Sequence, residues 1–411
     1  MSIKKIITGL ALSLLLASGV ASANDYDRAY KSGSHKAVFK EILPFAEQGN
    51  VGAQLWIASM YKFGQGVPEN HKTAVKWFTL AAEQGHAEAQ KNLAVMYKFG
   101  QGVPENYKTA IKWFILAAEQ GHAEAQENLA VMYKYGQGVP ASHKITEKWL
   151  SLAAEQGDAE AQKNLAVMYK FGQGVPENYN TAVEWFTLAA EQGHAAAQEN
   201  LAVMYKFGQG VPENHKTAVK WFTLAAEQGY AEAQNNLGVM YDLGQGAPEN
   251  HKTAVKWYAL AAEQEHAEAQ NNLGVMYDLG QGVPENHKTA VKWYALAAEQ
   301  GYAKAQNNLG LMYKLGQGVP ENNKTAVKLY TLAAEQGYAN AQDNMGALYE
   351  YGDGVFKDYR RAYMWYNLSS YNGSEKAGKH KDTLAKKMTT ADISKAQDMS
   401  SLCLESNYTG C

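Results

Sequence analysis

Five histidines recur at one place in a pattern of 36 residues, and histidine is a common metal ligand. They are His71, His143, His215, His251 and His287. Neighbouring helices pack about 8 to 10 Å apart, whereas metal–nitrogen bonds are about 2 Å long. Histidines one repeat apart therefore cannot readily share an ion, and Tyr107 and Tyr179 replace histidine in the same column. We expect neither a metal site nor a cofactor.

The familiar catalytic motifs are missing from the sequence. It contains no G-x-S-x-G nucleophile elbow, H-E-x-x-H zinc pair, P-loop or dinucleotide fingerprint. An active site also needs a unique constellation of side chains, whereas nearly every side chain here occurs in many copies. The pattern argues against an enzyme.

One column of asparagines is kept from copy to copy. An Asn side chain can donate to a carbonyl and accept from an N–H, so a ladder of them could hold the backbone of an extended peptide. The alternative is that each Asn ties its helix to the neighbouring one. The column comprises Asn92, Asn128, Asn164, Asn200, Asn236, Asn272, Asn308 and Asn344, preceded by Trp56.

Two adjacent columns change in character along the chain. The first five copies carry Lys62-Phe63, Lys98-Phe99, Lys134-Tyr135, Lys170-Phe171 and Lys206-Phe207, and the next two carry Asp242-Leu243 and Asp278-Leu279. Lys beside a ring suits an acidic or aromatic segment, and Asp beside Leu suits a basic or aliphatic one. We predict a partner groove with two halves. The alternative is that the rings pack beneath the neighbouring loops.

The elements that position these columns come from nine copies of the 36-residue unit, over residues 49–372. A glycine opens each copy, with Glu265 standing in once, and no copy contains an insertion. A constant period of this length is typical of a solenoid in which each unit is one supersecondary element. The opening glycines are Gly49, Gly85, Gly121, Gly157, Gly193, Gly229, Gly301 and Gly337.

Each unit predicts two antiparallel helices. In the second copy a first helix runs from Ala87 to Phe99, and the segment Gly100 to Pro104 ends it, because glycine favours the left-handed C-terminal position and proline cannot continue a helix. Asn106 is a candidate N-cap for the second helix. The apolar stripes at helical spacing are Ala89, Leu93, Met96 and Tyr97 on the first helix and Ala110, Trp113, Phe114 and Ala117 on the second.

The loop GxGVP, the run Leu-Ala/Gly-x-Met-Tyr and the ending Trp-Phe/Tyr-x-Leu-Ala-Ala-Glu-Gln-Gly resemble the Sel-one-like repeat, a relative of the tetratricopeptide repeat. The resemblance covers all nine units and departs locally at Thr146-Glu147, Leu329 and Phe356. It implies an all-α, right-handed superhelical solenoid with the first helices on the concave side. It also implies a non-enzymatic adaptor that binds a protein or peptide there.

Two other functions stay open at this stage. Cysteine-rich secreted relatives have been linked to penicillin binding or hydrolysis, so the resemblance also suggests a cell-wall-related activity on β-lactam or peptidoglycan substrates. A rigid spacer without a specific ligand is the third possibility. In this sequence we find no nucleophile with a base that would support the enzymatic alternative.

Both ends of the chain differ from the repeats. Residues 1–23 carry Lys4-Lys5, an apolar run from Ile6 to Val20 and small residues before position 24, which is typical of a cleaved signal peptide. We therefore expect a periplasmic or secreted protein. Residues 24–48 predict an N-terminal helical cap, and residues 373–411 a C-terminal helical cap and tail. Cys403 and Cys411 lie in this tail, where they form either a disulfide or two free thiols.

The charge balance indicates no polyanion as the main partner. The formal net charge is −3, and removal of Lys4 and Lys5 makes it about −5. Neither nucleic acid nor an anionic membrane is therefore an obvious partner. We expect a monomer without an integral membrane segment after cleavage.

Overall fold

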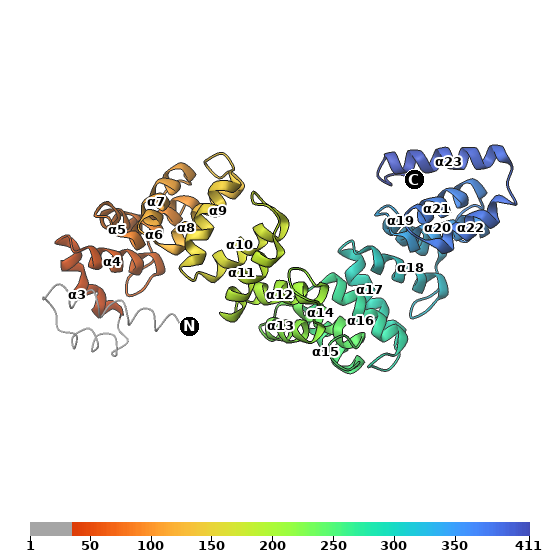
Figure 1. Cartoon of the computed structure of the whole chain (residues 1–411), viewed down its shortest axis with the longest axis horizontal. Coiled ribbons are helices and arrows are strands. Elements are labelled where there is room, and N and C mark those ends of the chain that lie inside the picture. Colours follow the sequence, from red (N-terminus) through yellow and green to blue (C-terminus); the bar gives the residue numbers. More distant parts are fainter. Residues whose placement is uncertain (1–34) are drawn as a thin grey trace. The chain divides into compact units, whose positions relative to one another are not determined.

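A computed structural model describes residues 35–411, which form helices and connecting turns without a strand (Figure 1). Nine helix hairpins follow one another, each with a first (A) helix and a second (B) helix. The A helices are α4 (Val51–Phe63), α6 (Ala87–Phe99), α8 (Ala123–Tyr135), α10 (Ala159–Phe171), α12 (Ala195–Phe207), α14 (Ala231–Asp242), α16 (Ala267–Leu279), α18 (Ala303–Leu315) and α20 (Ala339–Tyr351). The B helices are α5 (His71–Glu83), α7 (Tyr107–Glu119), α9 (His143–Glu155), α11 (Tyr179–Glu191), α13 (His215–Glu227), α15 (His251–Glu263), α17 (His287–Glu299), α19 (Asn323–Ala334) and α21 (Tyr359–Tyr371).

Helices outside the hairpins cover both ends of the described chain. They are α3 (His35–Glu47), α22 (Glu375–Ala385) and α23 (Thr390–Glu405). The predicted signal peptide and the first part of the predicted N-terminal cap lie outside the described residues. Positions within a repeat are numbered below from the first residue of its A helix.

The described residues fall into two compact units, one ending at Ala197 and the other beginning at Gln198. Within each unit the helices pack in chain order: α6 on α7 and α7 on α8 in the first, and α14 on α15 and α15 on α16 in the second. Each hairpin thus packs against its predecessor and its successor in the unit, which is the arrangement of a solenoid.

The helix limits follow from local sequence. The Asn106 side chain accepts a hydrogen bond from the backbone N–H of Thr109 at 2.9 Å, and Asn caps are among the most stabilising. Gly100 adopts a left-handed conformation with φ of 67° and bonds back to the carbonyl of Met96. The predicted first helix from Ala87 to Phe99 and the predicted N-cap are therefore confirmed.

In both units the second glycine of a GxG loop joins consecutive repeats. A Cβ on Gly102 would overlap the backbone carbonyl of His71, at the start of the preceding B helix, and the same holds for Gly282 and His251. These glycines also have positive φ angles, 74° and 72°. Only glycine allows both this conformation and this close approach.

Small and aromatic side chains form the core between repeats. In α7 the buried stripe is Ala110, Ile111, Phe114, Ala117 and Ala118. The stripe predicted from the sequence also included Trp113, and this part of the prediction was wrong. Trp113 is half-buried and packs against the clusters of two consecutive repeats. Its position makes it a contact between repeats rather than the centre of one.

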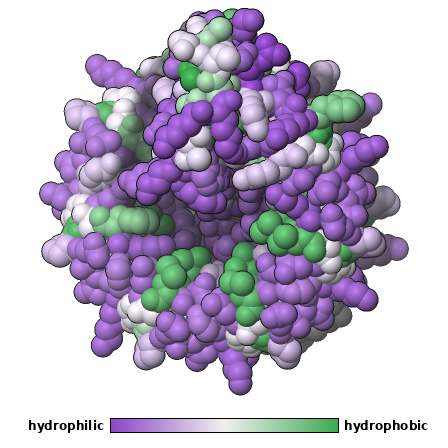
Figure 2. Space-filling view, turned by 90° about the vertical axis from the view of Figure 1, so that its right-hand side faces the viewer, coloured by the Kyte–Doolittle hydropathy of each residue, from purple (hydrophilic) through white to green (hydrophobic). Residues whose placement is uncertain are grey.

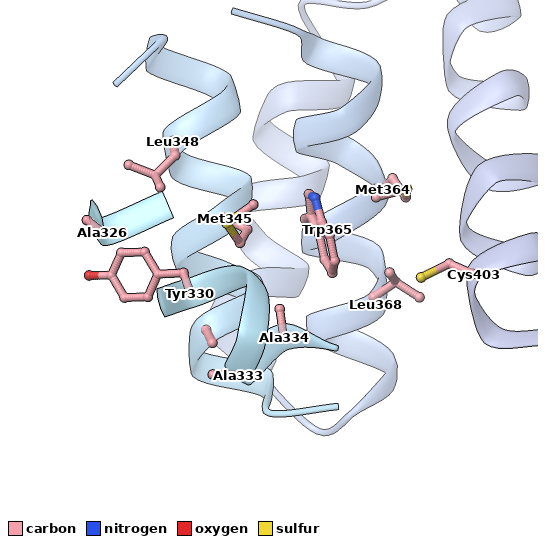
Figure 3. Packing of buried hydrophobic residues seen from close by; sticks show 11 residues of the cluster. Ala326, Tyr330, Ala333, Ala334, Met345, Leu348, Met364, Trp365, Leu368 and Cys403 are labelled. Carbon is pink, nitrogen blue, oxygen red and sulfur yellow. The ribbon is translucent and has the colours of Figure 1, made fainter. Parts of the chain in front are cut away.

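The last repeat packs against the C-terminal helices. Trp365 and Leu368 of α21 lie in one cluster with Cys403 of α23, which points toward Leu368 (Figure 3). A disulfide joins Cys403 to Cys411 and closes the short tail after α23. At the other end, Ile42 and Ala46 of α3 are buried against the first repeat.

Candidate partner-binding surface

A chain of glutamines, alternately buried and exposed, links the repeats on the side away from the GxG loops. Gln120 donates to Gln90 at 2.8 Å, and Gln90 donates to the carbonyl of Ala82 in the preceding repeat at 3.1 Å. The same bond between the B-helix end and position 4 recurs in other repeats, as between Gln264 and Gln234 at 2.8 Å. Because Gln90 both donates to a backbone carbonyl and accepts from Gln120, burying its amide costs little free energy. They belong to the framework and are not free to bind a ligand.

The predicted asparagine ladder also makes contacts between repeats. In the second unit Asn272 donates to Asn235 at 3.1 Å, Asn308 to Asn271 at 3.0 Å and Asn344 to Asn307 at 2.9 Å. Their acceptors lie one position earlier on the A helix of the preceding repeat. These bonds favour the structural interpretation of the column over a ladder that holds a peptide backbone.

In the first unit, lysines of the preceding repeat contact the same column. Lys62 donates to Asn92 at 3.4 Å and Lys98 to Asn128 at 3.2 Å. Asn164 instead contacts Lys163 and Glu160 of its own helix. The remaining members are half-buried at the same position of α12 and α14, namely Asn200 and Asn236.

Each predicted Lys–aromatic pair is a cation–π contact within one helix end. The Nζ of Lys98 lies 5.2 Å from the centre of the Phe99 ring, and four other pairs have distances of 5.1 to 5.6 Å. Burial lowers the pKa of Lys62, Lys98 and Lys206. These ammonium groups are therefore partly withdrawn from solvent. The other pairs are Lys62-Phe63, Lys134-Tyr135, Lys170-Phe171 and Lys206-Phe207.

The predicted acidic pair has partners inside its own repeats. Asp242 lies 2.8 Å from Nδ1 of His251, and Asp278 lies 2.9 Å from Nδ1 of His287. The Tyr294 hydroxyl donates to Asp278 at 3.5 Å. Burial, together with the charge of Asp242, raises the pKa of Tyr258. Both aspartates thus tie the end of an A helix to the following B helix.

Position 13, the last helical residue or the residue after it, remains exposed in every repeat. It holds a large hydrophobic side chain whose exposed fraction lies between 55% and 69%. The sequence analysis placed the aromatic members and the leucines Leu243 and Leu279 in two halves of a groove, whereas the structure exposes all of them at one position. The row consists of Phe63, Phe99, Tyr135, Phe171, Phe207, Leu243, Leu279, Leu315 and Tyr351.

The surface seen in Figure 2 is mostly hydrophilic. Viewed from the right-hand side of Figure 1, hydrophilic residues cover most of the surface and hydrophobic ones form separate patches (Figure 2). Isolated exposed hydrophobics are ordinary on a protein surface, but a row repeated at one position is not scattered. We call these nine side chains the position-13 row.

Charge pairs join the starts of consecutive A helices. His122 lies 2.8 Å from Glu88, which also contacts Lys91 at 2.8 Å. Burial alone would raise the pKa of Glu88, but the hydrogen bonds and charges of His122 and Lys91 lower it to about 2. Among the described residues no ion pair involves Glu127: burial, Asp158 and Glu160 raise its pKa to about 7 against the opposing charge of Lys163.

Neither a metal site nor a membrane-spanning helix is found among the described residues. Between residues 35 and 411 no group of three His, Cys, Asp or Glu side chains could hold a metal ion. In the same range no helix has the length and apolar character needed to cross a membrane. The repeats present two rows of exposed hydrophobic side chains: the position-13 row, and less exposed leucines on the B helices such as Leu116 and Leu188.

Comparison with known proteins agrees with this architecture. The Sel1 repeat model matches residues 51–86, 87–122, 123–158, 159–194, 195–230, 231–266, 267–302, 303–338 and 339–374. The chain is 30% identical to c5321, described as a protective antigen of uropathogenic Escherichia coli displaying an SLR fold, with 95% of this chain and 96% of that chain covered and a TM-score of 0.59. It is 33% identical to a Sel1 repeat protein of Oxalobacter formigenes, with coverage of 76% and 91% and a TM-score of 0.60. Among curated proteins none matches the chain.

Proposed function

Because the chain belongs to the Sel1 repeat family, whose repeats generally serve protein interactions, we propose that it is a scaffold that binds a protein partner through the position-13 row. The supporting observation is that all nine repeats expose a large hydrophobic side chain at this one position. The framework does not need these side chains, because its contacts between repeats use other columns. Desolvation of such side chains is the main source of binding free energy.

The position-13 row changes from aromatic to aliphatic side chains along the chain. The first unit presents Phe63, Phe99, Tyr135 and Phe171, each with a lysine over its ring. The second presents Phe207, also with a lysine over its ring, and then three consecutive leucines. The neighbouring Asp242 and Asp278 contact histidines, and Asp278 also accepts the Tyr294 hydroxyl. We assign the difference in preference to aromatic against aliphatic contact, rather than to opposite charge.

Export of the chain is part of the proposal. It is supported by the basic, apolar and small-residue order of residues 1–23 and by a disulfide in the tail, which persists in oxidising compartments. A partner would then be another periplasmic or secreted protein.

Site-specific photocrosslinking tests the surface. A photoreactive residue at Phe99 or Phe171, introduced in the native host, should capture a defined partner that mass spectrometry identifies. The matched control places the same residue at Leu116 or Leu188, which are also exposed but lie on B helices.

Binding of the identified partner then gives a quantitative test. The triple variant Phe63→Ser/Phe99→Ser/Phe171→Ser should weaken binding by at least about tenfold, since each lost anchor contributes about 1 kcal/mol or more. The control Leu80→Ser/Leu116→Ser/Leu188→Ser should bind normally. Equal loss in both variants, or crosslinks from the B helices alone, would contradict the assignment.

A further inference from the structure

The C-terminal end of the array is locally basic although the chain as a whole is slightly acidic. Residues 356–395 contain nine Lys and Arg against four Asp and Glu, whereas the whole chain has 38 against 41. Some of these cations cover buried acids of the last repeat: Lys376 and His380 contact Asp343, at 3.3 and 2.8 Å. The slightly negative net charge of the whole chain therefore does not describe this region, which is positively charged.

The loop between α20 and α21 departs from the eight preceding loops. At positions 18 and 19 those loops have proline followed by glutamate in seven cases and by alanine in one, while this loop has Phe356 and Lys357. Both side chains are exposed, and the Phe356 side chain is 97% exposed. Since eight copies make the same turn with proline, the fold does not require a phenylalanine or a lysine here.

Three cations line an open pocket beside this loop. They are Lys357 and Arg360 at the start of α21 and Lys387 after α22, and Tyr359, Met388 and Thr389 complete the wall with two acids. Lys387 contacts Glu350 at 3.0 Å. Within the described residues neither Lys357 nor Arg360 forms an ion pair, and Lys357 lies 4.8 Å from the Tyr359 ring centre.

The two acids in the pocket wall are already engaged with the backbone or with a hydroxyl. Asp358 accepts the backbone N–H groups of Arg360 and Arg361, at 2.9 and 3.1 Å, and so caps α21. Asp392 accepts the Thr389 hydroxyl at 2.8 Å. These contacts hold the carboxylates at the helix starts, whereas the side chains of Lys357 and Arg360 extend into solvent.

We propose that this surface docks on a membrane that contains anionic phospholipid. We define the cap patch as Phe356, Lys357, Arg360, Arg361, Lys386 and Lys387, all of them exposed. Lys357, Arg360 and Lys387 line the pocket, and Arg361 lies 4.0 Å from Asp358. Five Lys and Arg together are enough to attract an anionic lipid surface, and both residue types bind phosphate oxygens. The Phe356 ring supplies apolar area that enters the interface.

The exposure of the Phe356 ring favours a membrane over an acidic protein as the partner of this patch. An acidic segment would pair with the cations equally well, but a side chain that is 97% exposed has no wall around it to receive a shaped partner. A lipid interface needs no such wall. The docking goes beyond partner binding through the position-13 row and does not depend on it.

Vesicle co-sedimentation of the full chain tests the proposal. The probes are phosphatidylcholine vesicles with and without phosphatidylglycerol. The test variant Phe356→Pro/Lys357→Glu restores the sequence of seven other loops, so it should melt like the parent chain. The control Lys108→Glu makes the same charge change at the position equivalent to Arg360 on α7, where the side chain is also exposed.

We expect the parent chain to bind phosphatidylglycerol vesicles, more weakly as salt rises, and the test variant to bind at least about tenfold more weakly. Lys108→Glu should bind like the parent. The apolar N-terminal run is common to all variants, so the quantity compared is the part of the binding that depends on phosphatidylglycerol and on salt. Equal binding to both vesicle types, or full binding by the test variant, would overturn the proposal. The proposal would also be overturned if the chain bound inorganic phosphate or polyglutamate but did not bind vesicles that contain phosphatidylglycerol.

Discussion

The backbone of Gly274 lies directly against the ring of Tyr294, so that a Cβ on the glycine would come within 2.7 Å of the ring. Gly238, Gly310 and Gly346 have the same relation to Tyr258, Tyr330 and Tyr366. In the five earlier repeats, where Phe or Leu stands in place of the tyrosine, alanine stands in place of the glycine. The residues at positions 8 and 28 are therefore matched across the contact between the two helices.

Gly274→Ala should destabilise its repeat. Overpacking against a buried ring costs about 1 to 3 kcal/mol, and the better helix propensity of alanine offsets up to about 1 kcal/mol of this. We expect a net loss of about 1 to 2 kcal/mol in native-state hydrogen exchange of α16 and α17. The double variant Gly274→Ala/Tyr294→Phe recreates the pair Ala94 and Phe114 and should recover most of the loss. A single variant as stable as the parent would refute the match.

Removal of the Tyr330 hydroxyl should stabilise the protein. This oxygen is buried and has no hydrogen-bond partner among the described residues, because position 12 of its repeat is Lys314 rather than an acid. A buried unsatisfied group costs about 1 to 3 kcal/mol, so Tyr330→Phe should gain about 1 kcal/mol in urea unfolding.

Tyr366→Phe is the matched control, for which we expect the free energy of unfolding to fall rather than rise. The Tyr366 hydroxyl donates to the buried Glu350 at 3.0 Å, and its loss should cost about 1 to 2 kcal/mol. Two variants of equal stability would contradict this account.

Glu127 should make the second to fourth repeats less stable as the pH rises. Its pKa is raised from an ordinary 4.5 to about 7 by burial, Asp158 and Glu160. Between these values the folded chain binds more protons than the unfolded chain, so stability falls with rising pH through this window. Glu127→Gln should therefore melt above the parent at about pH 8 and with it at about pH 4.

Glu88→Gln should behave in the opposite way. The pKa of Glu88 is lowered to about 2, so its contribution is present above about pH 4.5 and is lost as the pH falls toward 2. The variant should melt below the parent at neutral pH and converge with it in acid. Parallel melting curves of both variants at every pH would contradict the assigned contacts.

Trp113→Ala should loosen two repeats and leave distant ones intact. The side chain contacts the clusters of the second repeat and of the one before it. Truncation of a buried Trp costs about 3 to 5 kcal/mol, and we expect the lower end because Trp113 is half-buried. Hydrogen exchange should accelerate in α5 to α8 only. Uniform loss of protection through the first unit would show that the repeats do not act as local units.

The local parts of the fold were readable from the sequence. Gly100 and Asn106 have strong conformational preferences of their own, so they fix where α6 ends and α7 begins without reference to the rest of the chain. The period of 36 residues likewise predicted nine hairpins.

The sequence did not predict which neighbours the side chains of each polar column contact. Lys62 and Asn92 lie 30 residues apart and Asn272 and Asn235 lie 37 apart, so their contacts form only when the repeats pack. The sequence shows that glycine at position 8 occurs together with tyrosine at position 28. It does not show the reason, which is the distance between the Gly274 backbone and the Tyr294 ring.

The close approach of Gly102 to His71 has a genetic consequence. The same contact recurs between Gly282 and His251, so this part of the junction between two neighbours is the same at different points of the array. Recombination between two copies of the coding segment that removes or adds a multiple of 36 codons would join compatible surfaces and keep the reading frame. Such an event changes the number of side chains in the position-13 row and the length of the array in one step. An insertion of any other length would misplace every contact at the junction.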